Sequence, residues 1–143
     1  MTPEERAVRS ADAMWARDAA SRALGATLDA VGEGTARLSL TVEPRHCNGL
    51  GTCHGGVIFT LADSAFAFAC NARNRLTVAQ HAQVSFLAPA RAGDRLVAEA
   101  REVHLAGRSG LYDVRVTGPD GPVAEFRGMS RAIPGHHFDE EET

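Results

Sequence analysis

The chain has 143 residues, of which 44% are hydrophobic and 23% are charged, values that predict one globular domain with a sizeable core. Its formal net charge of −3 gives no support for nucleic-acid binding, and no apolar segment approaches the roughly 20 residues of a membrane span. Three cysteines and an N-terminus without an export signal predict a cytoplasmic protein with reduced thiols.

The first predicted element is an N-terminal helix. Thr2 and Pro3 have the pattern of a helix start, and an apolar face recurs at helical spacing through Trp15 to about Ala20, so residues 1–22 are assigned to this helical segment. Two strands follow, an irregular one over 26–31 and a half-buried one over 36–42, in which apolar and polar residues alternate. A turn at 32–34 joins them.

The second half is dominated by one apolar helix and four strands. The segment 44–52 is a loop, and the helix from Gly55 to about Ala72 is apolar on nearly every face, which predicts burial on all sides. Turn residues bound four strands, over 77–88, 94–105, 110–117 and 123–133. The predicted fold class is therefore α+β, a single domain over 1–135 in which an antiparallel sheet curls over one helix. An acidic tail over 136–143 is expected to be frayed.

The most informative stretch lies between Asn48 and Asp63. A carboxylate inside an apolar helix is costly to bury unless it is paired or used, and this helix carries Asp63. Before it, His54, Gly55 and Gly56 can present backbone N–H groups at a helix start, where the dipole favours negative charge. This combination indicates hydrolytic chemistry. Two simpler interpretations are a plain turn into a helix and an aspartate satisfied by a nearby serine or threonine.

The spacing within this stretch predicts a dimer. Gly55 and Asp63 are eight residues apart, about 12 Å along a helix axis, so one small reacting group cannot easily touch both. Two copies of the helix running antiparallel about a twofold axis would bring Asp63 of one chain near Gly55 of the other. Thr60, Asp63 and Ser64 form one polar stripe, which such a seam would accommodate.

Several stretches together resemble the hotdog-fold acyl-CoA thioesterases, in particular the phenylacetate-degradation (PaaI) subfamily. The resemblance covers roughly 25–133 and is carried by Asn48, by 53–56 and 61–65, and by three later stretches, 86–94, 110–113 and 126–130. It implies a hotdog fold and hydrolysis of an aryl-acetyl-CoA or medium acyl-CoA. It also implies a homodimer with shared sites that assembles further into a homotetramer, with coenzyme A as part of the substrate and no separate cofactor.

The resemblance also implies roles for individual residues. Asp63 would act as general base or nucleophile, and the Gly55 amide would bind the thioester carbonyl. Asn48 and His54 would orient the loop, the water or the thioester. Some relatives carry a hydroxyl residue on the strand after the helix, and here His81 occupies that place.

Other candidates for substrate contact are less specific. Gly56 and Ser64 flank the expected site, and Phe59, with Phe66 and Tyr112, could line an acyl pocket, although core packing explains the phenylalanines equally well. The chain has no lysine, so an anionic ligand such as the phosphates of coenzyme A must be held by arginine, histidine or backbone groups, and arginine suits phosphate geometry. The candidates at strand ends and turns are Arg91, Arg108, Arg127 and Arg131, each of which could equally be a solvated surface residue.

There are four rival interpretations, two for the site and two for the function. A zinc site at His46, Cys47, Cys53 and His54 lacks the usual ligand spacing, so no metal is expected. A Cys53–His54 nucleophile pair is disfavoured because adjacent side chains seldom point at each other. At the level of function, a hotdog hydratase or dehydratase and a non-catalytic acyl-CoA-binding module are the alternatives.

Overall fold

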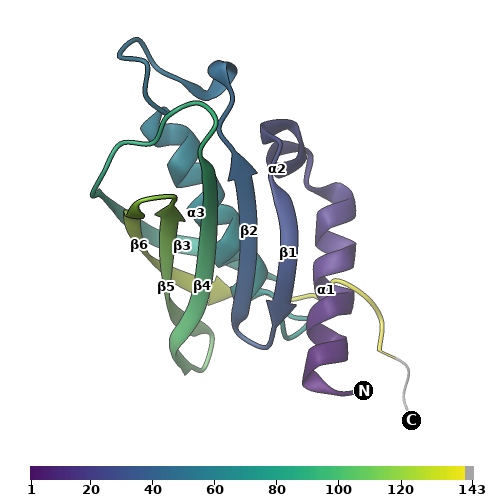
Figure 1. The fold of residues 1–143 in the computed structure, drawn as a ribbon. Coiled ribbons are helices and arrows are strands. Elements are labelled where there is room, and N and C mark those ends of the chain that lie inside the picture. Colours follow the sequence, from purple (N-terminus) through teal and green to yellow (C-terminus); the bar gives the residue numbers. More distant parts are fainter. Residues whose placement is uncertain (141–143) are drawn as a thin grey trace.

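One antiparallel sheet of six strands curves around a single long helix, and the computed structural model describes residues 1–140 of the chain (Figure 1). The central helix is α3 (Gly55–Cys70), and the sheet has the open strand order β1-β2-β4-β5-β6-β3. The predicted α+β hotdog arrangement is confirmed. The strands are β1 (Thr27–Gly32), β2 (Thr35–Thr41), β3 (Thr77–Phe86), β4 (Arg95–Ala106), β5 (Ser109–Gly118) and β6 (Gly121–Ala132).

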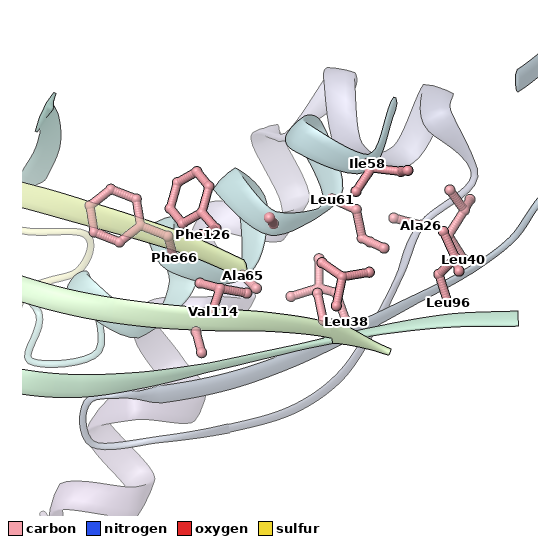
Figure 2. Close-up of a cluster of buried hydrophobic side chains, with 14 of the residues drawn as sticks. Ala26, Leu38, Leu40, Ile58, Leu61, Ala65, Phe66, Leu96, Val114 and Phe126 are labelled. Carbon is pink, nitrogen blue, oxygen red and sulfur yellow. The ribbon is translucent and has the colours of Figure 1, made fainter. Parts of the chain in front are cut away.

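The core lies between α3 and the sheet, as Figure 2 shows. Because α3 is apolar on nearly every face, it buries side chains along its whole length. Phe66 is fully buried, with its ring centroid 5.6 Å from that of Tyr112 and 5.7 Å from that of Phe126. Tyr112 is therefore part of the core rather than of an open acyl pocket. The buried residues of α3 are Ile58, Leu61, Ala62, Ser64, Ala65, Phe66, Phe68, Ala69 and Cys70.

Helix and sheet approach each other tightly at Gly128 of β6. A Cβ atom at this position would lie 2.8 Å from two atoms of the Phe66 ring, and that ring is 1% exposed and packed against Tyr112 and Phe126. Gly128→Ala is therefore expected to destabilise the fold by about 1–3 kcal/mol through overpacking. For a chain of this size that lowers the melting temperature by roughly 3–10 °C.

A double-mutant cycle with Phe66→Leu checks the cause. If the clash is responsible, Gly128→Ala costs less in the Phe66→Leu background than in the wild-type chain, because the smaller side chain leaves room for the added methyl group. An unchanged melting temperature for the single Gly128→Ala variant would contradict this account of the packing.

The N-terminal helical segment is interrupted, which differs from the single helix predicted over 1–22. The helix α1 (Pro3–Arg17) begins with a capping box between Thr2 and Glu5, and it ends at Asp18. Asp18 then caps a second helix, α2 (Ala19–Leu24), by accepting hydrogen bonds from the backbone N–H and hydroxyl of Ser21. An aspartate side chain that accepts hydrogen bonds from the residues after it favours a new helix start over continuation of the old helix, which explains why the chain turns here.

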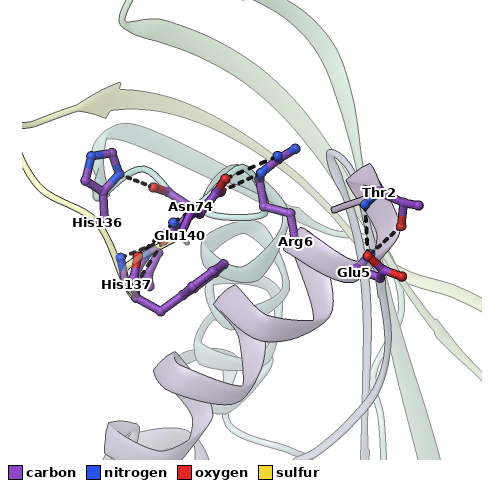
Figure 3. Close-up of polar contacts among 8 residues, drawn as sticks. Thr2, Glu5, Arg6, Asn74, His136, His137 and Glu140 are labelled. Carbon is purple, nitrogen blue, oxygen red and sulfur yellow. Dashed lines mark hydrogen bonds and ion pairs between the residues drawn. The ribbon is translucent and has the colours of Figure 1, made fainter. Parts of the chain in front are cut away.

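The C-terminal segment is docked where the sequence predicted fraying. Arg6 of α1 binds Glu140, and the Asn74 side chain accepts from the backbone N–H of His137 (Figure 3). Phe138 lies under the guanidinium of Arg9, 4.2 Å from ring centroid to Cζ. These contacts with residues far away in sequence hold the tail across the end of the domain. The last three residues of the predicted tail, 141–143, lie outside the described residues.

The two edges of the sheet differ. The helix α1 packs against β1, whereas β3 is the strand at the other edge: β6 is its one partner among the described strands, and the Asn71 side chain bonds the backbone of Thr77 at its start (Figure 1). Val78 and Phe86 of β3 are 47% and 54% exposed. An open strand edge with exposed apolar side chains is a template for pairing with another chain. No helix within residues 1–140 is both long and apolar enough to cross a membrane.

Candidate active site

The candidate site is built around a short closed loop that leads into α3. After the turn η1 (Pro44–His46), the chain doubles back so that the His54 N–H donates to the carbonyl oxygen of His46 at 2.8 Å. An isolated bridge joins Cys47 to Cys53, and the Asn48 N–H donates to the Thr52 carbonyl at 2.8 Å. Asn48 and His54 therefore belong to the same closed loop at the N-terminus of the helix.

His46 anchors this loop to the rest of the domain. It is 3% exposed, its Nδ1 accepts from the Glu43 N–H, and its Nε2–H donates to the Leu24 carbonyl at the end of α2. Both ring nitrogens are occupied, so His46 has a structural role.

Asn48 presents a free donor. Its Oδ1 atom accepts from the Leu50 N–H at 3.0 Å, and from the N–H and hydroxyl of Thr52 at 3.2 and 3.3 Å. Three donors converge on this atom, which identifies it as the oxygen and leaves the NH₂ group on the other side. That NH₂ group has no partner within residues 1–140. The side chain therefore both closes the loop and offers two N–H bonds to a ligand.

His54 is the N-cap of α3 and also leaves one group free. Its Nδ1 accepts from the Gly56 N–H at 2.8 Å, so in the neutral ring the proton is on Nε2. The ring is exposed, and Nε2 has no partner in the part of the chain that the structure describes. Gly56 is thus engaged in the cap rather than available to a substrate.

The Gly55 amide is the free N–H at the start of α3. The amides of Val57 and Ile58 donate to the His54 carbonyl, and that of Gly56 donates to the His54 ring. The Gly55 N–H has no acceptor among residues 1–140, and the dipole of the 16-residue helix lies behind it. A Cβ at Gly55 would lie 3.0 Å from Cζ of Phe86, so the ring of Phe86 covers this position closely.

Asp63 is half-buried in the middle of α3, with a carboxylate that has no hydrogen-bond or ion-pair partner within the described chain. Burial raises its pKa above the ordinary value of 3.8. The structural alternative, an aspartate satisfied by a neighbouring hydroxyl, is not what the structure has. The continuous helix keeps Asp63 about 12 Å along the axis from Gly55 of the same chain.

The polar stripe predicted along α3 does not act as one unit. Thr60 donates its hydroxyl to the Gly56 carbonyl of the same helix at 2.8 Å. Ser64 is buried, and its hydroxyl lies 2.8 Å from that of Ser21, which fastens α2 to α3. Only Asp63 of the three is left without a partner among residues 1–140, so the structure gives Ser64 a packing role instead of a place beside a substrate.

His81 is not brought to the site. On β6, Gly128 faces the Phe66 ring of α3, so the next residue, Met129, lies on the opposite face of the sheet. His81 pairs with Met129 across a bulge in β3 and therefore points away from α3 as well. The sequence places a polar residue on the right strand, but the bulge between Ala79 and His81 changes which face it occupies.

Phe59 keeps part of its surface open. Its ring packs edge-on against Phe126 with centroids 5.4 Å apart, and the side chain is only partly buried. It remains a candidate for contact with an acyl group on the α3 side of the sheet.

The candidate arginines are distributed over both ends of the sheet. Arg91 lies before β4, in a loop whose Ala90 carbonyl accepts from the Cys53 N–H, close to the start of α3. Arg108 lies after the 12-residue strand β4, at the opposite end, roughly 35–40 Å away along an extended strand. Arg127 is paired with Asp113 and is therefore committed to the sheet surface, while Arg131 is exposed on β6.

Cys53 and Cys70 do not have the environment of nucleophiles. Burial raises the pKa of Cys53 to about 11 and that of Cys70 to about 12, so both are thiols at neutral pH. Cys53 also directs its sulfur toward the carbonyl oxygen of His54, not toward the ring. Within the described chain, no group of three His, Cys, Asp or Glu residues could hold a metal ion.

Phe86 is a contact that sequence reasoning missed as a site residue. It ends β3 just before the loop 87–94 and is exposed even though it covers Gly55. The available signal was an aromatic residue at the end of a strand that precedes a proline, which is weak. The contact itself depends on how the loop returns to the start of α3.

Comparisons with known proteins agree on one family. Residues 50–125 match the model of the thioesterase superfamily. The acyl-coenzyme A thioesterase PaaI of Escherichia coli (strain K12) is 40% identical over 131 residues, which cover 91% of this chain and 94% of that protein.

Solved structures give the same result. The structure of the E. coli PaaI protein superposes with a TM-score of 0.92 at 39% identity, covering 94% of this chain and 99% of that one. A mutant structure of the phenylacetic acid degradation protein PaaI from Thermus thermophilus gives a TM-score of 0.77 at 36% identity, with coverage of 79% and 97%.

Proposed function

The chain belongs to the thioesterase superfamily, and from this premise we propose that it hydrolyses acyl-coenzyme A thioesters at a site made from the Asn48–Gly56 loop of one chain and Asp63 of a second. The chain is a thioester hydrolase. The proposed substrates are aryl-acetyl-CoA, such as phenylacetyl- or hydroxyphenylacetyl-CoA, and medium acyl-CoA. The reaction consumes the thioester and water and requires no cofactor, since coenzyme A is part of the substrate.

The observation that carries the proposal is a set of unpartnered groups of complementary kinds. The Gly55 amide, the Asn48 NH₂ group and the His54 Nε2–H are donors without acceptors within residues 1–140, and all belong to one loop. Asp63 is an acceptor without a donor there, with a pKa that burial raises. Donors that stabilise a developing oxyanion and a carboxylate that activates water are what thioester hydrolysis needs.

In the proposed mechanism the thioester carbonyl oxygen accepts from the Gly55 N–H. Asp63 of the partner removes a proton from water as the water oxygen attacks the carbonyl carbon, or its carboxylate attacks directly to form an anhydride that water then opens. Negative charge on the former carbonyl oxygen is stabilised by the amide and the helix dipole. When the C–S bond breaks, the electron pair leaves with sulfur, which takes a proton to give free coenzyme A.

The shared site requires a dimer, and the open edge of β3 is the proposed interface. The helix α3 runs antiparallel to β3, because Gly55 lies beside Phe86 and the Asn71 side chain donates to the Thr77 carbonyl. Antiparallel pairing of two β3 strands about a twofold axis therefore places two α3 helices antiparallel as well. That arrangement can bring Asp63 of one chain near Gly55 of the other. A further homotetramer and a cytoplasmic location are proposed with it.

Release of free thiol from a panel of acyl-CoA substrates tests this function. The panel contains phenylacetyl-CoA, hydroxyphenylacetyl-CoA, a medium-chain saturated acyl-CoA and an enoyl-CoA. Thiol release from the aryl-acetyl and saturated esters is expected. Hydration of the enoyl-CoA without thiol release would instead identify a hydratase, and tight binding without turnover would identify a binding module.

A further inference from the structure

A cationic cleft lies at the far end of α3 from Gly55. It has a volume of about 830 Å³, and Asn74, Arg75, Arg108 and His136 are among the residues that line it. Arg75 donates to the Gly107 carbonyl at 3.4 Å, which holds its guanidinium next to the turn that carries Arg108. The backbone of this turn is held in place by the hydrogen bond that the Ala132 N–H donates to the Arg108 carbonyl at 2.7 Å.

The charges in this cleft are not all neutralised by one another. A third arginine of the wall, Arg73, is paired with both Glu33 and Glu102, and Glu140 is paired with Arg6. Arg108 has no side-chain partner among residues 1–140, and Arg75 has no acidic one there. Of the acidic residues that line the cleft, Asp139 is the one whose side chain has no partner among residues 1–140. Two guanidinium groups with no acidic partner among residues 1–140, placed in one cleft, form a surface suited to phosphate.

The cleft is aligned with Asp63. Asp63 and Cys70 are seven residues apart, two turns on one face of α3, about 10 Å along the axis. A narrow space of about 30 Å³ beside Cys70 is lined by Arg75 and Arg108 as well, so it adjoins the cleft.

The length of coenzyme A matches this path. The arm between its sulfur and its first phosphate has about as many chain bonds as four amino-acid residues, so it reaches roughly 15 Å when extended. A thioester held at Asp63 would place its phosphates a few ångströms beyond Cys70. Gly55 of the same chain lies at the other end of α3, about 22 Å from Cys70. A coenzyme A whose carbonyl is bound at that Gly55 therefore cannot reach this cleft with its phosphates.

We infer that Arg75 and Arg108 hold the phosphates of the coenzyme A whose thioester is bound by Asp63 of the same chain and Gly55 of the partner. The inference rests on the proposed function. One chain then supplies the donor for the carbonyl, and the other supplies both the carboxylate and the phosphate contacts. Arg91, which lies at the Gly55 end, is the competing position for the phosphates.

Steady-state kinetics with two matched substrates test this assignment. One is an acyl-CoA, and the other is the N-acetylcysteamine thioester of the same acyl group, which has no phosphate. Arg75→Gln and Arg108→Gln are each expected to raise KM for the acyl-CoA about 10-fold, with little change in kcat. The KM for the phosphate-free thioester should not change. Added salt should reduce the difference in KM for the acyl-CoA between each variant and the wild type.

Two further variants sharpen the test. Asp139→Asn removes an acid from the same cleft and should lower KM for the acyl-CoA, which is the opposite sign. Arg37→Gln removes an exposed arginine from the sheet face opposite α3 and should leave KM unchanged for both substrates. Equal effects of the Arg75 and Arg108 variants on both thioesters, or an effect confined to Arg91→Gln, would overturn the inference.

Calorimetric binding of coenzyme A to the same variants in an Asp63→Asn background gives a readout without turnover. Weaker binding on loss of Arg75 or Arg108 supports the phosphate site even if the chain hydrolyses none of the panel substrates, so failure of the proposed function is distinguishable from failure of the cleft assignment. Unchanged binding in both variants would contradict it.

Discussion

Replacing Asp63 by asparagine is expected to lower kcat about 10²- to 10⁴-fold, the usual range for loss of a general base. Asparagine has nearly the same shape but cannot take a proton from water or attack the carbonyl carbon. Because the carboxylate has no partner within residues 1–140, the replacement breaks no polar contact of the described fold. Folding and substrate binding should therefore remain near normal, which separates this variant from one that merely unfolds.

The same variant should change the pH dependence of stability in a defined direction. The pKa of Asp63 is raised in the folded chain above its unfolded value near 3.8, so between the two values the folded state binds more protons. The free energy of unfolding contributed by this group therefore falls as pH rises through that window, and the full cost of the buried charge is present at neutral pH. Asp63→Asn removes this cost.

Melting curves of wild type and Asp63→Asn over a pH series measure this effect. The variant should melt higher at pH 7, and the difference should vanish below about pH 4, where the wild-type carboxyl is protonated. In parallel, the acid limb of kcat/KM for the wild type should have its midpoint above 3.8. Full activity of Asp63→Asn would remove this residue from the mechanism.

The second large effect is expected for Gly55→Ala. The new Cβ would lie 3.0 Å from Cζ of Phe86 and 3.4 Å from two neighbouring ring atoms, so either the ring or the helix start must shift. A shift of the helix start would move the Gly55 amide out of alignment with the thioester carbonyl. Loss of one donor of this kind costs about 10²- to 10³-fold in kcat. Alanine is tolerated in a first helical turn, so the melting temperature should change little.

Gly49→Ala is the matched control in the same loop. A Cβ at Gly49 would meet nothing within 4 Å, and its backbone does not have the positive φ that disfavours other residues. Activity and stability should both remain at the wild-type level. If Gly55→Ala retained full turnover although the start of α3 had shifted, the amide at this helix start would not be the oxyanion donor.

Much of the fold was predictable because its signals are local. The apolar circumference of α3 and the turn residues between the later strands predict one buried helix within an antiparallel sheet, and the structure confirms both. The loop before α3 was also predictable as a donor site, since a glycine pair after a capping histidine leaves few acceptors for the first amides.

The remaining features depend on contacts between distant segments. A bulge in β3 turns His81 to the opposite face, and strand alternation alone does not reveal it. Ser64 is engaged by Ser21, which lies 43 residues earlier in the chain, and the tail is held by Arg6 and Asn74. The cleft at Arg75 and Arg108 likewise forms only when the end of α3 meets the turn after β4.

Mixed dimers of Asp63→Asn and Gly55→Ala chains test most directly whether each site is shared between two chains. In such a dimer one site combines the intact Gly55 of the first chain with the intact Asp63 of the second, and the other site has both defects. Random pairing makes half of the dimers mixed, so co-expression should restore about a quarter of the wild-type thiol release. Activity no higher than the mean of the two separate variants would show that Gly55 and Asp63 do not act together across the interface.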